Sequence, residues 1–119
     1  MNFSPFEIAQ YYMHETSDTE LTVEQRELLV CLFEEAAEVT QVIAKILRFG
    51  YASRNPHTGV AVADRLQTEV ADFLGIVDRL IELELFSVDA LAEGADAKQT
   101  KLENYLLYKG DTQLVDDHE

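Results

Sequence analysis

Apolar residues recur at steps of three and four positions along most of the chain, and this spacing is typical of one face of an α-helix. The longest such segment begins after Thr22 and continues to about Phe49. Thr22 and Gln25 have the spacing of a capping box, which starts a helix. Gly50 is placed to end it, because glycine tolerates the left-handed conformation that often follows a last helical turn. The pattern therefore predicts a long helix over residues 22–49.

A second long helix is predicted after a loop over residues 51–59, which is rich in residues that favour turns. Its apolar positions again follow the helical period. It is expected to start at Ala61 or Asp64 and to end near Glu84.

Shorter helices are expected on either side of the long pair. The first covers residues 4–14. Ser87 has the character of a cap for another helical turn, and Gly94 is expected to break the chain again. A last helix is expected over about residues 96–109.

No segment alternates with period two for long enough to indicate a sheet. We therefore expect an all-α fold, a helical bundle whose two long central helices form an antiparallel hairpin. At 119 residues, the chain is expected to form one domain over residues 1–110, followed by a solvated, frayed acidic tail over residues 111–119. One hairpin with short flanking helices leaves apolar surface uncovered, so we expect a homodimer or homotetramer to complete the bundle.

Two glutamates interrupt the apolar face of the first long helix. Glu35 lies seven residues after Leu28 and seven before Val42, and Glu38 lies four before Val42. Both are therefore expected to point toward the core side, one turn apart, with Glu34 at the edge of the same face. The apolar positions of this face are Leu28, Cys31, Leu32, Val39, Val42, Ile46 and Phe49.

The second long helix departs from its pattern in the same way. Glu69 lies three residues after Leu66 and four before Phe73. Asp72 lies four residues before Ile76, so this pair too is expected to face inward, one turn apart. The apolar positions of this face are Val62, Leu66, Val70, Phe73, Ile76, Val77 and Leu80.

An antiparallel hairpin would bring the two acidic pairs to the same height. Glu38 lies about 16 Å before the end of the first long helix, and Glu69 about 13 Å after the start of the second, at the helical rise per residue. A single inward-facing carboxylate is ordinarily a boundary residue whose end reaches water. Two such pairs at matched height on facing helices indicate a shared site instead.

Four clustered carboxylates cannot all be ionised in a poorly hydrated site without a cation, because like charges and desolvation both oppose it. Hard divalent cations with oxygen ligands resolve this conflict. Di-iron bundles place a histidine three residues after a glutamate, whereas the corresponding positions here are Glu38 and Asp72. The ligand set therefore favours Mg²⁺, with Mn²⁺ as a substitute.

The overall charge narrows the classes of partner. The formal net charge is −14, and such a chain is repelled by nucleic-acid backbones, so we expect no nucleic-acid binding. No apolar run approaches the length of a membrane span, and no signal-peptide pattern opens the chain, so the cytoplasm is the expected compartment. Cys31, the one cysteine, is expected to be a small core residue.

The acidic motifs resemble a known family. The residues EEAAE at 34–38 and EVAD at 69–72 resemble the EExxE…ExxD signature of the MazG-type all-α nucleoside triphosphate pyrophosphohydrolases. The residues LRFG at 47–50 also resemble members of that group. The resemblance covers residues 28–80 well and the last predicted helix loosely. It implies Mg²⁺-dependent hydrolysis of a nucleoside triphosphate between its α and β phosphates, giving the monophosphate and pyrophosphate.

Carried over by position, the resemblance implies a role for each acidic residue. Glu34 would orient or deprotonate the attacking water. The Mg²⁺ ligands would be Glu35, Glu38, Glu69 and Asp72.

The phosphates of a nucleotide also need cationic donors. Lys45 lies seven residues after Glu38, on the same face. In the last predicted helix, Lys101 and Asn104 share a face at three-residue spacing and resemble the family's basic and asparagine positions. We expect these three residues to contact substrate phosphates.

Two other interpretations remain open. A phosphoribosyl-ATP pyrophosphohydrolase of histidine biosynthesis resembles the same family in fold and carboxylates. Alternatively, a non-enzymatic helical interaction protein would keep the carboxylates for metal-stabilised assembly.

Overall fold

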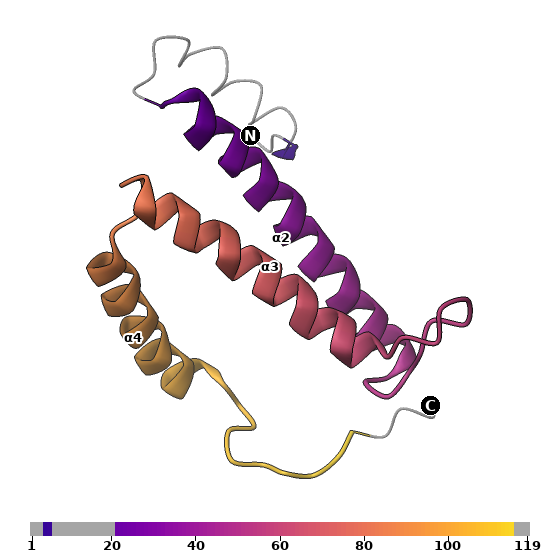
Figure 1. Ribbon diagram of the computed structural model, residues 1–119. Helices are drawn as coiled ribbons and strands as arrows, with labels where there is room; N and C mark the ends of the chain where they lie inside the picture. The colour runs from indigo at the N-terminus through magenta and orange to yellow at the C-terminus, as the bar shows by residue number, and fades with distance from the viewer. Residues whose placement is uncertain (1–3, 6–20, 116–119) are drawn as a thin grey trace.

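The computed structural model describes residues 4, 5 and 21–115, and this part of the chain forms three α-helices without a β-strand (Figure 1). They are α2 (Val23–Phe49), α3 (Val62–Glu82) and α4 (Val88–Tyr105). The predicted all-α class is therefore confirmed for these residues. The helix expected over residues 4–14 falls almost entirely outside the described residues. None of the described helices is both long and apolar enough to cross a membrane.

The ends of α2 are set by the residues that predicted them. The Thr22 hydroxyl accepts a hydrogen bond from the Gln25 backbone N–H at 3.0 Å, and the Gln25 side-chain oxygen accepts one from the Thr22 N–H at 2.9 Å. Gly50 has a φ of 97°, and its N–H donates to the Ile46 carbonyl at 2.8 Å. The capping box and the glycine end are both confirmed.

A closed loop connects α2 to α3. An isolated antiparallel β-bridge joins Arg54 to Ala61, the residue that precedes α3. The Asn55 side-chain oxygen accepts a hydrogen bond from the His57 N–H at 2.8 Å, which shapes the turn inside the loop. The Ala61 side chain cannot cap α3. The β-bridge therefore fixes the backbone where this helix begins.

Helices α2 and α3 lie side by side and run in opposite directions (Figure 1). At one end, the Gln25 side-chain amide donates to the Leu83 carbonyl at 2.9 Å. Apolar side chains fill the contact between the helices, and two of them are buried: Val42 is 3% exposed and Leu80 is 0% exposed. The half-buried residues around them are Leu28, Leu32, Val39, Ile46, Leu66, Phe73, Ile76 and Val77.

Three positions of the predicted apolar faces lie outside this contact. Cys31 is exposed, so the expectation of a core cysteine is wrong. Phe49 and Val70 are also exposed, at 64% and 38%. The reason is geometric: a straight helix rotates by about 20° with each seven-residue step, and one partner helix covers only a narrow stripe.

The expected break at Gly94 does not occur. Helix α4 continues through this residue from Val88 to Tyr105, and Ser87 caps it by accepting the Ala90 N–H at 3.3 Å. A glycine costs a helix about 1 kcal/mol relative to alanine, and the neighbouring alanines at 92, 95 and 97 favour helix enough to offset that cost. No residue of α4 is buried.

The chain is more extended than a compact domain of its length. Its radius of gyration is 18.1 Å, whereas a compact 119-residue domain has about 13.5 Å. Its accessible surface is 10464 Å², against about 6,500 Å² for a compact monomer of this size. The contact between α2 and α3 is therefore a thin core.

Replacing Leu80 by alanine tests that core. Because Leu80 is fully enclosed, Leu80→Ala is expected to lower the free energy of unfolding by about 2–5 kcal/mol through lost transfer energy and a residual cavity. Urea denaturation followed by circular dichroism measures the loss. Leu114→Ala is the matched control, because Leu114 is 91% exposed and its truncation should change stability by less than about 0.5 kcal/mol. Equal losses in both variants would contradict this core.

Candidate metal centre

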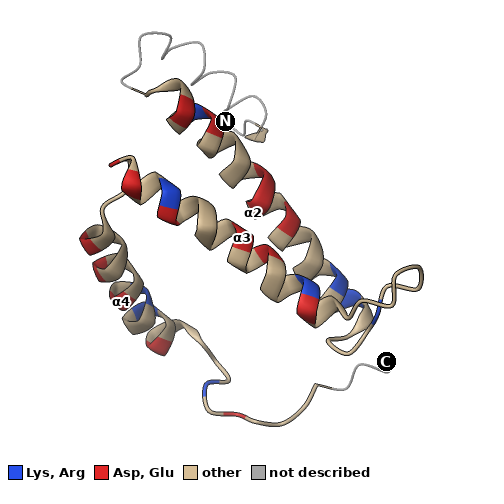
Figure 2. Cartoon of the chain, viewed as in Figure 1, with Lys and Arg blue, Asp and Glu red and all other residues tan. Residues whose placement is uncertain are grey.

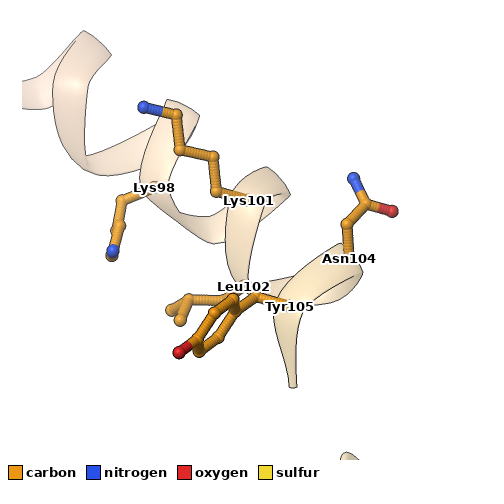
Figure 3. A pocket seen from close by; sticks show the side chains of 5 residues that line it. All are labelled: Lys98, Lys101, Leu102, Asn104 and Tyr105. Atoms are coloured by element: carbon orange, nitrogen blue, oxygen red, sulfur yellow. The ribbon is translucent and has the colours of Figure 1, made fainter. Parts of the chain in front are cut away.

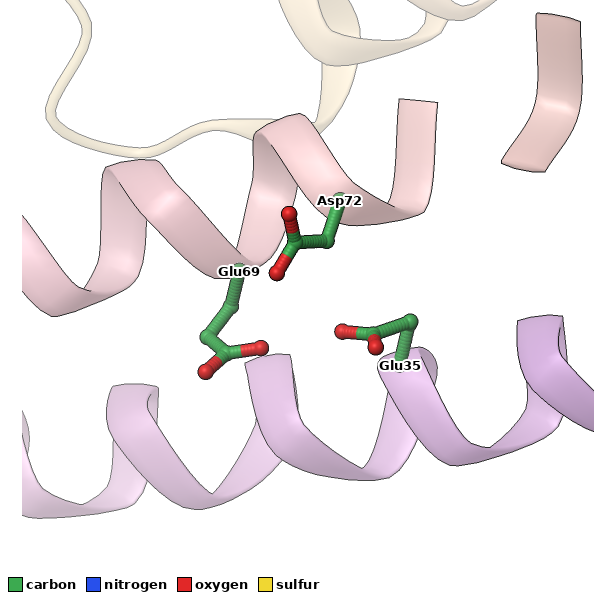
Figure 4. A group of neighbouring side chains, drawn as sticks. All are labelled: Glu35, Glu69 and Asp72. Carbon is green, nitrogen blue, oxygen red and sulfur yellow. The ribbon is translucent and has the colours of Figure 1, made fainter. Parts of the chain in front are cut away.

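Three carboxylates meet where α2 contacts α3. Glu35 comes from α2, and Glu69 and Asp72 come from α3, and one oxygen of each lies within 4.8 Å of the others (Figure 4). Figure 2 shows acidic residues at the middle of both helices, opposite one another. The structure thus brings together three of the four residues predicted as metal ligands.

Helix geometry explains how these side chains converge. Glu69 and Asp72 are one turn apart on α3, so they extend from the same face. Glu69 is 8% exposed and is the one buried charged residue in the part of the chain that the structure describes. Glu35 is half-buried, and its Oε2 atom is enclosed without a hydrogen-bond partner. An enclosed oxygen without a donor is an acceptor that a cation would satisfy.

The carboxylates change the proton affinity of Glu35. A hydrogen bond shared with the Glu69 carboxyl raises the pKa of Glu35 above its ordinary value of 4.5. Partial loss of hydration raises this pKa further, and so do the negative charges of Glu69, Asp72 and Glu38. Each of these causes opposes ionisation of Glu35, and a bound cation would reverse them.

Glu38, the fourth predicted ligand, lies outside the group of three and has a cationic partner. The Arg65 guanidinium donates from Nε to Glu69 Oε1 at 2.9 Å, and its Nη2 lies 3.5 Å from Glu38 Oε2. Arg65 therefore joins α3 to α2 at the edge of the site. Sequence reasoning missed this residue, although its position four residues before Glu69 is a signal for a helical ion pair.

The remaining predicted site residues are not members of this group of three carboxylates. Glu34 and Lys45 are exposed on α2. Lys101 and Asn104 line a cavity on α4 that is widely open to solvent, with Lys98, Leu102 and Tyr105 (Figure 3). Because α4 supplies every residue that lines this cavity, the described chain does not bring its cations to the carboxylates.

The three carboxylates fit a small divalent cation. Two oxygens bound to one Mg²⁺ at about 2.1 Å lie no more than about 4.2 Å apart, so modest side-chain rotations would bring these oxygens into one coordination sphere. Hard oxygen donors without histidine or cysteine suit Mg²⁺ or Mn²⁺. The donor set and its spacing are consistent with the predicted cofactor.

Replacing Glu35 by glutamine tests the electrostatics of the site. Because the folded state raises the pKa of Glu35, ionised Glu35 opposes folding above that pKa, and its cost fades as the pH falls toward 4.5. Without metal, Glu35→Gln is therefore expected to melt at a higher temperature than the unmodified protein at about pH 8. The gap should narrow on acidification. Millimolar Mg²⁺ should raise the melting temperature of the unmodified protein and have little effect on the variant.

Thermal melting at several pH values, with and without Mg²⁺, measures both effects. Glu27→Gln is the matched control, because Glu27 is an exposed residue of the same helix and should change neither. An unchanged melting temperature together with a full Mg²⁺ response in Glu35→Gln would exclude Glu35 from a metal site.

Comparisons of this chain with protein-family models, with curated protein sequences and with solved structures find no match.

Proposed function

We propose that this protein is a Mg²⁺-dependent nucleoside triphosphate pyrophosphohydrolase of the MazG type. One observation carries the proposal: Glu35, Glu69 and Asp72 meet across the contact between α2 and α3. These residues occupy the positions at which the two acidic motifs resemble the EExxE…ExxD signature. The motif and the spatial cluster are separate observations, because a motif on two helices need not converge in space.

The reaction joins water to a nucleoside triphosphate. The oxygen of water forms a bond to the α-phosphorus, and the bond from that phosphorus to the bridging α–β oxygen breaks. The products are the nucleoside monophosphate and pyrophosphate. Mg²⁺ bound at the site would neutralise phosphate charge, polarise phosphoryl oxygens and lower the pKa of a bound water.

The acidic side chains divide this work. Glu35, Glu69 and Asp72 would hold the cation, and Glu38 would join them as a fourth ligand. Glu34 would orient the attacking water and accept its proton. Its exposure keeps it accessible to solvent and substrate at the edge of the α2 face.

Cationic and polar groups would hold the triphosphate chain. Lys45 on α2, and Lys101 and Asn104 on α4, are the proposed phosphate contacts; because α4 holds the last two away from the carboxylates of its own chain, they would contribute from a second copy in the proposed assembly. The cavity that Lys101 and Asn104 line also has an apolar side formed by Leu102 and Tyr105. An apolar and aromatic surface beside cations suits a nucleotide, whose base stacks while its phosphates pair.

The finer architecture belongs to the same proposal. The antiparallel pair of α2 and α3 would be the hairpin of a helical bundle that a second copy, or a pair of dimers, completes. The chain exposes about 4,000 Å² more surface than a compact monomer of its length, and obligate dimers bury about 2,000–5,000 Å² in total. Helix α2 also carries an exposed apolar row on which a copy could pack, formed by Val30, Phe33 and Leu47.

Light scattering of the purified protein tests the assembly. The expected mass is that of a dimer or tetramer, and Phe33→Asp should shift it toward the monomer, because Phe33 is 64% exposed on the apolar row. Leu114→Asp is the control and should leave the mass unchanged. A monomer at micromolar concentration would contradict the proposed assembly.

Pyrophosphate release from a panel of ribonucleoside and deoxyribonucleoside triphosphates with Mg²⁺ tests the reaction. Asp72→Asn is expected to lower kcat/KM by about a hundredfold or more, since losing a charged ligand weakens the stabilisation of transition-state charge by several kcal/mol. Asp78→Asn, an exposed position on the same helix, should retain full activity. Monophosphate must appear in equal amount.

No release from any nucleotide by a folded, Mg²⁺-stabilised protein would sink the proposed reaction. Phosphoribosyl-ATP would then be the next substrate to test. Metal-dependent assembly without any hydrolysis would support the interaction protein instead.

A further inference from the structure

Arg65 occupies an unusual place for a cation, at the edge of a proposed cation site. Its Nε donates to Glu69 Oε1 at 2.9 Å, and its Nη2 lies 3.5 Å from Glu38 Oε2. The Glu69 side chain is only 10% exposed, whereas that of Arg65 is 54% exposed. The guanidinium therefore covers a buried carboxylate, and the Arg65 side chain itself remains exposed to solvent.

These contacts engage two of the four proposed metal ligands. A guanidinium and a divalent cation compete for carboxylate oxygens, because each needs their lone pairs and the two positive charges repel. In the described chain, Glu38 is paired with Arg65 and stands outside the group formed by Glu35, Glu69 and Asp72. A divalent ion that recruits Glu38 as a fourth ligand would draw charge from the carboxylate that Arg65 contacts and so weaken this ion pair.

We infer that Arg65 exchanges partners: it is the counter-cation of Glu38 and Glu69 without metal, and it contacts a substrate phosphate once a divalent ion displaces it. This inference rests on the proposed metal site and deepens the proposed function. The displaced side chain stays attached four residues from Glu69, and its planar fork of donors matches phosphate oxygens. The Arg65 side chain is also 54% exposed, so an incoming triphosphate can reach it from solvent.

The same helix supplies a matched control. Arg79 on α3 also reaches across to α2, with Nη2 3.4 Å from Glu24 Oε1, and its Nη1 lies 3.8 Å from Glu82 Oε2. Its side chain is 58% exposed, close to the value for Arg65. Arg79 therefore makes the same kind of ion-pair bridge between α3 and α2, but away from Glu35, Glu69 and Asp72. Replacing Arg79 shows what the loss of such a bridge does by itself to the measured affinities.

The first experiment measures Mn²⁺ affinity by isothermal titration calorimetry on the full-length protein. Arg65→Gln is expected to bind Mn²⁺ about tenfold more tightly than the unmodified protein, because a competing charge is removed. Arg79→Gln should bind it with unchanged affinity. An equal or weaker affinity in Arg65→Gln would overturn the exchange, since Arg65 would then support the carboxylates rather than compete for them.

The second experiment measures the binding of inorganic pyrophosphate to the same proteins at saturating Mn²⁺. Arg65→Gln is expected to bind it about tenfold more weakly, and Arg79→Gln as tightly as the unmodified protein. Equal affinity in Arg65→Gln would overturn the phosphate contact and with it the exchange.

These measurements separate the two proposals. If both affinities change as expected but no nucleotide is hydrolysed, the partner exchange is supported and the pyrophosphohydrolase proposal is wrong. If nucleotide is hydrolysed but Arg65→Gln leaves the Mn²⁺ affinity unchanged, the pyrophosphohydrolase proposal is supported and the partner exchange is wrong. A protein that binds no Mn²⁺ at all would contradict both.

Discussion

Repulsion between carboxylates at the contact of α2 and α3 is the constraint on which the rest of this structure depends. Glu69 is buried, and its carboxyl lies close enough to Glu35 to raise the pKa of that residue. Acidic residues in a helix contact oppose the packing that the apolar residues favour. The burial of Val42 and Leu80 elsewhere in the same contact favours the packing of the helices, and the Arg65 guanidinium offsets part of the charge. The clustered carboxylates therefore lower the stability of the helix pair at the position where a bound cation would need them as ligands.

That cost falls on a chain with little apolar burial to offset it. Two apolar side chains are buried in the described residues, and α4 has no buried residue. A divalent cation between the carboxylates would stabilise the helix pair by neutralising charge. A second copy on the exposed apolar row of α2 would stabilise it by removing apolar area from water. The proposed cofactor and the proposed assembly are therefore physically linked, and each would stabilise the helix pair that forms the site.

Local patterns were reliable where a few adjacent residues decide the outcome, and they failed where many residues or a second helix decide it. The capping box of Thr22 and Gln25 formed as predicted, because its two hydrogen bonds lie within four residues. The break at Gly94 was wrong, because propensity is summed over many residues and one glycine is a small part of the total. Cys31 lies on the predicted apolar face and yet is exposed. The spacing of apolar residues does not show how wide a stripe of the helix its partner covers.

The sequence by itself determined that Glu35 would lie one turn from Glu38 on α2, and that Glu69 would lie one turn from Asp72 on α3, since helical spacing requires it. Only the tertiary structure decided which of these carboxylates meet. The rotation of α2 against α3 and the choice of rotamers bring Glu35 to Glu69 and Asp72, and leave Glu38 with Arg65. Those choices depend on side-chain packing between residues far apart in the chain, and no local pattern records them.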